Sequence, residues 1–211
     1  MDSDTLNEMR EAASALSDVG KVAVQSGLVK ASGGNLSMKV KEDYFLITKT
    51  ATWLDRLEIS DFVLLDLESH EVCYGTGKPS TEYKIHSGPY RLRKGIRSVI
   101  HLHPQWPVIA TALGVPIRPL TLDHYSYLDH VSTVPFYQNG SEELGKAVTA
   151  AADKGSDVVV MANHGVACFG DSPYMGLRKA LNIEEAAKAS VVARNITGKD
   201  LDTEHFERKH L

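Results

Sequence analysis

The spacing of apolar residues along the chain predicts several helices. From residue 6 to residue 28 they recur every three or four positions, as on one face of an amphipathic helix, and Gly27 lies near the end, where helices commonly stop. Residues 141–152 start with a serine and two glutamates, which favour a helix N-terminus. We expect the other helices at residues 81–94, 104–113 and 173–196.

Short apolar runs between these helices predict strands. We expect them at residues 36–40, 43–48, 62–67, 71–74, 99–102, 132–136, 157–161 and 166–169. Residues 114–135 contain three prolines, and we expect this segment to be irregular apart from the strand at its end. Strands and helices alternate, with several hairpins and no linker-like composition. The sequence therefore predicts one α/β domain over residues 1–211, with a central, mostly antiparallel sheet covered by helices on both faces.

Composition and charge narrow the classes of function. Of the 211 residues, 43% are apolar and 24% are charged, which is ordinary for a globular protein, and the net charge of -4 comes from interspersed acids and bases. This distribution argues against a nucleic-acid partner. No apolar run approaches the roughly 20 residues of a membrane span, and the first residues do not resemble a signal peptide. With two distant cysteines, Cys73 and Cys168, we expect free thiols and a cytoplasmic location.

Two histidines at the end of a predicted strand are candidate metal ligands. His101 and His103 are separated by one residue, so on a strand both side chains point to the same face and can bind one ion. Neutral imidazole is a ligand that zinc prefers, although manganese, cobalt and iron accept the same ligand types. The alternative is that these histidines are two ordinary polar residues at a strand edge.

A third histidine and a glutamate extend this candidate site. His164 follows an apolar strand, and Gly165 after it permits a tight turn or an unusual backbone dihedral. Three histidines leave an open fourth position, as in catalytic zinc sites. Glu82 lies at the start of a predicted helix, where a carboxylate is often present only because of the helix dipole. Near a metal it can also transfer protons to and from a substrate.

Three loops of small hydroxyl or amide residues are candidates for binding an anion. They are residues 33–37, 48–51 and 79–81, and their backbone N–H groups and hydroxyls form the kind of cradle that holds phosphate. None of them matches the Walker pattern, so a nucleotide role does not follow. Taken singly, each loop is also compatible with an ordinary turn.

In order and approximate spacing, these stretches resemble the class II aldolase/adducin family over roughly residues 5 to 195. The matching segments are Gly-Asn-Leu-Ser at 34–37, Ile-Thr-Lys-Thr at 47–50, Lys-Pro-Ser-Thr-Glu at 78–82, His-Leu-His-Pro at 101–104 and Asn-His-Gly at 163–165. By size and motif, the chain is most similar to fuculose-phosphate-type aldolases. Any one segment is unspecific, whereas the combination is specific.

The resemblance implies a zinc-dependent lyase acting on a sugar phosphate. It implies a homotetramer with active sites at subunit interfaces, and cleavage of a fuculose-1-phosphate-like, deoxy-pentulose or methylthioribulose 1-phosphate to dihydroxyacetone phosphate and an aldehyde. It implies that Glu82 is both a catalytic residue and a ligand of the resting ion. The implied metal ligands are His101, His103, His164 and Glu82, and the implied phosphate-binding residues are Gly34, Asn35, Thr50, Ala51, Ser80 and Thr81. A proton donor from a neighbouring subunit is implied among His124, Tyr125 and Tyr127, with Tyr125 favoured.

The sequence departs from the family pattern in two places, and several activities stay open. The second loop reads Thr-Lys-Thr-Ala where aldolases commonly have Thr-Pro-Thr-Gly, so at Ala51 the permissive backbone of glycine is lost. Residues 117–135 are longer than in the sugar-phosphate aldolases, which bears on the identity of the substrate. The alternatives are a pentulose-phosphate 4-epimerase, a decarboxylase or a dehydratase of the same family. A non-catalytic adducin-like module and a structural zinc site completed by Cys168 are less compatible with the intact ligand set.

Overall fold

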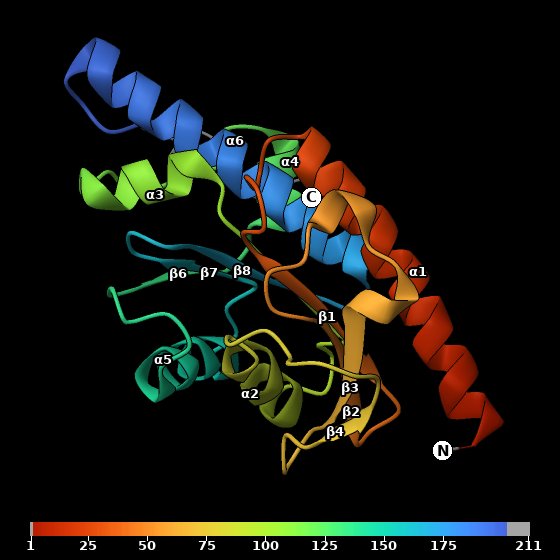
Figure 1. Cartoon of the computed structure of the whole chain (residues 1–211). Helices are drawn as coiled ribbons and strands as arrows, with labels where there is room; N and C mark the ends of the chain where they lie inside the picture. Colours follow the sequence, from red (N-terminus) through yellow and green to blue (C-terminus); the bar gives the residue numbers. More distant parts are fainter. Residues whose placement is uncertain (1, 202–211) are drawn as a thin grey trace.

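The structure is a computed structural model that describes residues 2–201, and its centre is one eight-stranded sheet (Figure 1). The strand order is β4-β3-β2-β1-β5-β8-β7-β6, and every pair is antiparallel except β6 with β7. The strands are β1 Asn35–Val40, β2 Tyr44–Thr48, β3 Phe62–Asp66, β4 Val72–Tyr74, β5 Ser98–Leu102, β6 Val131–Val134, β7 Val158–Met161 and β8 Gly165–Gly170. The predicted mostly antiparallel sheet is confirmed.

Helices cover both faces of this sheet. They are α1 Ser3–Gln25, α2 Lys84–Leu92, α3 Gln105–Ala112, α4 Leu122–Tyr127, α5 Glu142–Asp153 and α6 Pro173–Thr197, with short 3-10 helices η1 Leu54–Arg56 and η2 Ile59–Asp61. Figure 1 shows α1 and α6 on one side of the sheet and α2 and α5 on the other. The predicted α/β architecture is therefore confirmed.

The alternation of side chains along the strands creates two separate cores. On β7, Val158 and Val160 pack into the core under α1 and α6, whereas Val159 and Met161 pack into the core with α2 and α5. Successive residues of a strand point to opposite faces, so an unbroken apolar strand supplies both layers. This explains why β7 carries four consecutive buried apolar residues.

Local sequence fixes where the longer helices begin and end. The side chains of Asp2, Ser141 and Ser172 accept backbone N–H groups at the starts of α1, α5 and α6, respectively. After Ser172, Pro173 occupies the first turn of α6, where its missing N–H costs no hydrogen bond. Gly198 ends α6 in the left-handed conformation. These helix bounds agree with the sequence prediction to within a few residues.

The start of one helix and the presence of another differ from the prediction. Residues 81–83 form a turn rather than the first turn of α2, because Tyr83 and Ile85 donate to carbonyls only three residues back, on Ser80 and Glu82. The prediction of an irregular segment over residues 114–135 is wrong where α4 forms. Thr121 caps this helix: its side chain accepts the His124 N–H. The His124 side chain in turn accepts the N–H of Thr121, which completes a capping box. This box stabilises a short helix in a segment where the prolines indicated irregular structure.

Within residues 2–201, no helix combines the length and the apolar character that crossing a membrane requires. The two cysteines are free; Cys73 is exposed on β4, and Cys168 is buried in β8.

Candidate metal centre

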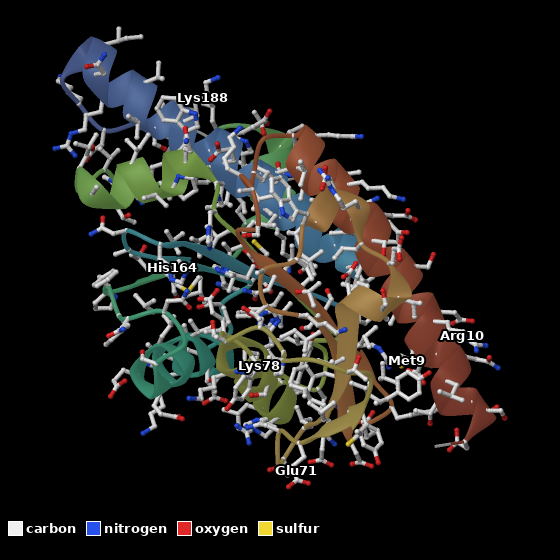
Figure 2. The ribbon with its side chains drawn as sticks, viewed as in Figure 1. Met9, Arg10, Glu71, Lys78, His164 and Lys188 are labelled. Carbon is white, nitrogen blue, oxygen red and sulfur yellow. The ribbon has the colours of Figure 1, made fainter. Side chains whose placement is uncertain are left out.

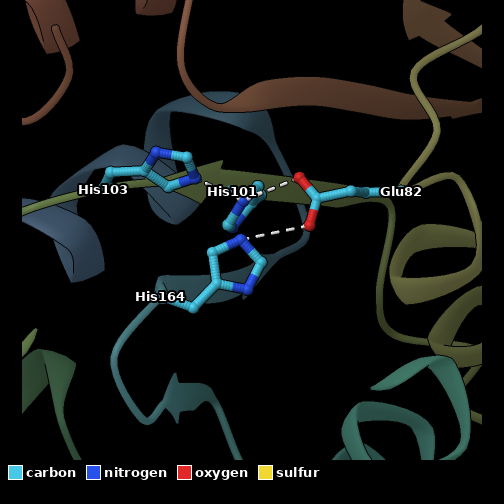
Figure 3. Close-up of side chains that lie close together, drawn as sticks. All are labelled: Glu82, His101, His103 and His164. Atoms are coloured by element: carbon cyan, nitrogen blue, oxygen red, sulfur yellow. Dashed lines mark hydrogen bonds and ion pairs between the residues drawn. The ribbon is translucent and has the colours of Figure 1, made fainter. Parts of the chain in front are cut away.

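Three segments that lie far apart in the sequence meet at one edge of the sheet. His101 lies near the end of β5, which is flanked by β1 and β8, and His103 follows that strand. His164 lies in the tight turn between β7 and β8, and Glu82 lies in the turn before α2. Figure 2 shows His164 on the side of the sheet edge that faces α5 and α2. Figure 3 shows all four side chains pointing toward one another.

The four side chains form a compact group of possible metal ligands. One ligand atom from each residue lies within 4.8 Å of the others. Each carboxylate oxygen of Glu82 lies close to a histidine: Oε2 is 3.1 Å from His101 Nε2, and Oε1 is 3.2 Å from His164 Nε2. The Nε2 atoms of His101 and His103 are 2.9 Å apart. The structure thus brings together the four residues that the sequence predicted as ligands.

The hydrogen bond on the far side of the His101 ring fixes its tautomer. The Nδ1–H group of His101 donates to the carbonyl of Val166, at 2.9 Å. In the neutral ring, the lone pair then lies on Nε2, which faces the other ligands. A backbone carbonyl behind the ring is the usual way in which proteins orient a metal-binding imidazole.

Burial keeps His103 neutral. Removal from water, together with neighbouring His101 and His164, lowers the pKa of His103 to about 3. Its lone pair is therefore available to an ion at neutral pH. The ring passes directly against Gly165, where an added Cβ would lie 2.8 Å from His103 Cδ2. The absence of a side chain at Gly165 is what leaves room for His103.

The sequence suggests two roles for Gly165, a tight turn or an unusual backbone dihedral; the structure has the tight turn at 162–164 but not the unusual dihedral at Gly165. Asn163 has the left-handed conformation, with φ 56°, and Gly165 does not have a positive φ. Asparagine tolerates this conformation better than most residues, so the turn needs no glycine for its backbone. Glycine at this position serves close packing.

Glu82 is a buried carboxylate whose two oxygens have different surroundings. Burial favours its neutral form, but the facing rings of His101 and His164 outweigh this effect and hold the pKa of Glu82 below its usual range. The side-chain amide of Asn35 donates to Oε2 at 2.9 Å. Oε1 is buried and accepts no hydrogen bond from residues 2–201.

These properties fit a divalent metal ion. Three imidazole nitrogens and a carboxylate oxygen are a donor set that zinc, manganese, cobalt and iron accept. A buried carboxylate oxygen without a hydrogen-bond donor is costly unless a cation lies nearby. The group is therefore a candidate metal centre whose ion could be any of these four.

The predicted anion-binding loops lie side by side next to Glu82. The backbone N–H of Thr50 donates to the Lys78 carbonyl at 3.2 Å, and that of Ser80 donates to the Thr48 carbonyl at 3.0 Å. The buried Ser80 hydroxyl accepts the N–H of Glu82 at 3.3 Å. Thr50, Ala51 and Thr81 are exposed.

The backbone of Ala51 and Gly34 and the side chain of Asn35 bear on the predicted role of these loops. Ala51 has φ 61°, so the left-handed backbone is present here although the residue is not glycine. The side-chain amide of Asn35 is occupied at both ends, by Glu82 and by His86. Gly34 also has a positive φ, and an added Cβ there would lie 2.7 Å from the carbonyl of His101.

The predicted proton donors lie on α4, away from the metal centre of their own chain. Helix α4 packs against α6, and the buried His124 accepts the N–H of Leu120 at 3.1 Å. Tyr127 lines a hollow beside Gly170, the last residue of β8. The turn with His164 precedes the first residue of that strand, and a six-residue strand spans roughly 16 Å. A role for Tyr125 at a metal centre therefore stays a prediction that involves a neighbouring copy.

Comparison with known proteins places this arrangement in a family. A protein-family profile described as Class II Aldolase and Adducin N-terminal domain matches residues 14–191. The chain belongs to this family.

Relatives within the class II aldolase family have more than one activity. The L-fuculose phosphate aldolase of Methanocaldococcus jannaschii is 32% identical over 164 residues, which are 78% of this chain and 87% of that protein. The 3-oxo-tetronate 4-phosphate decarboxylase of Haemophilus influenzae is 26% identical over 175 residues, 81% of this chain and 82% of that protein. The crystal structure of L-fuculose-1-phosphate aldolase from Thermus thermophilus has a TM-score of 0.78 at 25% identity, with coverage of 90% of this chain and 97% of that one.

The structure also reveals buried partners of the class II aldolase site that the sequence analysis missed. Asn35 accepts a hydrogen bond from His86 Nε2, whose other nitrogen lies 2.7 Å from Ser37 Oγ. Ser37 Oγ lies 2.7 Å from the hydroxyl of Tyr90. The available signal was a repeat of polar residues every four positions: Glu82 in the turn before α2, and His86 and Tyr90 on α2 itself.

Proposed function

We propose that this class II aldolase family member is a divalent-metal-dependent lyase that cleaves a ketose 1-phosphate to dihydroxyacetone phosphate and an aldehyde. The supporting observation is the complete group of Glu82, His101, His103 and His164, buried and compact within one chain. A relative that is 32% identical is an L-fuculose phosphate aldolase, which favours a deoxy-ketose 1-phosphate as substrate. Zinc is the ion that we expect.

Each residue of the centre has a distinct role in this proposal. A bound divalent ion supplies Lewis-acid stabilisation of the negative charge that develops on substrate oxygens. His101, with its ring held by Val166, would present Nε2 to the ion, and His103, with its pKa lowered by burial, would present a neutral nitrogen. Glu82 would be a further ligand of the resting ion, and its Oε1, which has no hydrogen-bond donor within residues 2–201, would transfer the proton at the substrate carbon.

The exposed loops next to Glu82 hold the substrate phosphate in this proposal. Thr50 and Thr81 offer hydroxyl groups, and the backbone around Gly34 and Ala51 offers N–H groups. Ser80 links this region to the metal centre, because its hydroxyl already binds the N–H of Glu82. A phosphate anchored here orients the reacting carbons toward Glu82, which lowers the entropic part of the barrier.

The active site in this proposal needs a second copy of the chain. In cleavage, Tyr125 of a neighbouring copy accepts the proton of the hydroxyl that becomes the aldehyde oxygen, and in the reverse direction it donates that proton back. A neighbouring copy is needed because α4 packs against α6 at a distance from its own metal centre. We therefore expect a homotetramer with its active sites at subunit interfaces. We also expect the whole of residues 1–211 to act as one domain in the cytoplasm.

A decarboxylase is the second candidate. A match of 26% identity to a 3-oxo-tetronate 4-phosphate decarboxylase covers 81% of this chain, and the match to the aldolase covers 78%. Loss of carbon dioxide next to a carbonyl also requires stabilised negative charge on a substrate oxygen, so the same metal ligands serve both reactions.

The test combines metal analysis with product release. The purified protein is analysed for bound metal by mass spectrometry, then assayed with a panel of ketose 1-phosphates for dihydroxyacetone phosphate and with 3-oxo-tetronate 4-phosphate for carbon dioxide. We expect stoichiometric metal, and aldol cleavage that falls by about 10²- to 10⁴-fold in Glu82→Gln. Glu71→Gln, at an exposed residue directly before β4, is the matched control. Bound metal with carbon dioxide release alone would establish the decarboxylase, and absence of metal would refute both.

A further inference from the structure

We infer that His86 is a positioning residue that orients the carboxylate of Glu82 through Asn35. His86 is the centre of a buried hydrogen-bond chain whose other members are Ser37 and Tyr90. The kinetic part of this inference rests on the proposed role of Glu82, whereas its structural part does not.

The geometry of two elements brings these side chains together. Asn35 and Ser37 are two residues apart on β1, so they point to the same face of the sheet. His86 and Tyr90 are four residues apart on α2, so they lie on the same face of the helix. The strand face meets the helix face and is excluded from water, since His86 and Ser37 are 0% exposed.

The side-chain amide of Asn35 gives these hydrogen bonds their directions. Its NH₂ group can only donate, and it donates to Glu82 Oε2 at 2.9 Å. This leaves the amide oxygen, Oδ1, facing His86. Because an amide oxygen also only accepts, His86 must carry its proton on Nε2.

The other side of the His86 ring is consistent with this tautomer. Burial lowers the pKa of His86 to about 3, so the ring is neutral and has one N–H group. With the proton on Nε2, Nδ1 accepts the hydroxyl proton of Ser37, at 2.7 Å. Burial raises the pKa of Tyr90, which keeps its hydroxyl protonated as the donor to Ser37 Oγ, at 2.7 Å.

The consequence is that His86 selects one of two orientations of the Asn35 amide. If His86 carried its proton on Nδ1, its Nε2 lone pair would face Oδ1, and the amide would turn its oxygen toward Glu82 instead. The Nε2–H tautomer prevents this rotation, so Oε2 of Glu82 stays bound while Oε1 keeps no hydrogen-bond donor within residues 2–201. The chain thereby determines which carboxylate oxygen is available for chemistry.

The first test reads the tautomer directly, without activity. Nitrogen-15 NMR of histidine-labelled apo protein at neutral pH distinguishes Nε2–H from Nδ1–H rings, and His86→Gln assigns the His86 signals. We expect His86 as the Nε2–H tautomer, with its Nδ1 accepting from Ser37. An Nδ1–H tautomer or a mixture at His86 would overturn the inference.

The second test measures the metal centre with Co²⁺ alone as the probe. His86→Leu removes the donor to Asn35, and we expect a roughly 10- to 100-fold weaker Co²⁺ affinity with an altered visible absorption spectrum. His86→Gln keeps an amide donor and should recover most of the affinity. Phe45→Leu is the matched control, because Phe45 packs against Tyr90 in the same core and takes no part in the chain. Folded His86→Leu with wild-type affinity and spectrum would contradict the inference.

These readouts separate failure of this inference from failure of the proposed function. If wild-type protein turns over none of the substrates, the proposed activity fails, and the NMR and Co²⁺ results still decide the role of His86. If turnover is found, His86→Leu should lower kcat by roughly 10- to 100-fold with little change in KM, because it leaves untouched the loops 48–51 and 79–81, which carry Thr50 and Thr81. If His86→Leu does not fold, Ser37→Ala provides the milder change, and we expect it to produce a mixture of His86 tautomers.

Discussion

The candidate metal centre and two of the predicted anion-binding loops, residues 48–51 and 79–81, lie next to each other but are built differently. The ligand side chains are buried or half-buried, and His101 and Glu82 are each held by a further hydrogen bond, with Val166 and Asn35. In the loops, Thr50, Ala51 and Thr81 are exposed, and the hydrogen bonds that join the two loops are mainly between backbone groups. The metal centre is therefore fixed by the folded chain, whereas the loops offer groups that stay accessible to an anion.

This difference follows from the chemistry of the two ligands. A metal ion needs several ligand atoms at fixed distances, so each side chain must be oriented before the ion binds. A phosphate accepts hydrogen bonds from many directions, so turns with free N–H and hydroxyl groups suffice. Changes in the metal centre should therefore affect stability and metal affinity more than changes in the loops do.

The largest expected effect is the pH dependence conferred by His86. Its pKa is about 3 in the folded protein and about 6.5 when unfolded, so below pH 6.5 the unfolded state binds a proton that the folded state does not. Its contribution to stability is complete above pH 6.5 and is lost as the pH falls toward 3, on the order of 4 to 5 kcal/mol in all.

We therefore expect the unfolding free energy of apo protein to rise more steeply with pH between 4 and 6 than in His86→Gln. The difference in slope should be about 1.4 kcal/mol per pH unit, measured by urea unfolding at a series of pH values. The exposed His130, replaced in His130→Gln, is the matched control for removing a histidine. Equal slopes for wild type and His86→Gln would show that His86 is protonated or accessible in the folded state.

A medium effect is expected at Gly165, where the metal centre depends on close packing. In Gly165→Ala the new Cβ meets the Leu102 carbonyl and the ring of His103, so the ring must move. We expect a destabilisation of about 1–3 kcal/mol and at least roughly tenfold weaker metal binding. Gly95→Ala is the control, since nothing lies within 4 Å of an added Cβ there. Thermal unfolding and metal titration give the answer, and identical values for both variants would refute the packing argument.

The smallest effect on stability is expected at Ala51, in the predicted anion-binding loop 48–51. Its left-handed backbone costs an alanine roughly 1–2 kcal/mol, and glycine removes that strain but adds about 0.4–1 kcal/mol of unfolded-state entropy. Ala51→Gly should therefore stabilise the protein by roughly 0 to 1.6 kcal/mol, measured by urea unfolding. Ala150→Gly, in the ordinary backbone of α5, should destabilise it by about the same amount. A destabilised Ala51→Gly would mean that Ala51 is not strained.

The sequence predicted the parts of the fold that periodicity determines. The apolar run of β7 and the spaced apolar residues of α1 led to correct elements because each pattern matches its own geometry. The pairing of His101 with His103 followed from the two-residue repeat of a strand. Helix α4 was not predicted, because the three prolines of residues 114–135 indicated an irregular segment. In the folded chain a local capping box outweighs the effect of these prolines.

The sequence could not predict features that depend on distances between elements. The space that Gly165 leaves for His103 exists only because β8 lies beside β5. The contacts of His86 with Asn35 and Ser37 require α2 to lie over β1. Pairs such as these are invisible to periodicity, since each residue alone is compatible with an ordinary helix or strand. The assignment of the phosphate residues and of Tyr125 stays a prediction.

The wide separation of the ligands along the chain has a consequence for the lifetime of the folded protein. Glu82 and His101 are roughly 20 residues apart, and roughly 60 residues lie between His103 and His164. An ion held by all of them closes two long loops at once, and it must be released before the chain can open fully. Loss of the ion would then remove a cross-link that slows unfolding, so metal starvation would shorten the survival of this protein as well as stop the proposed reaction.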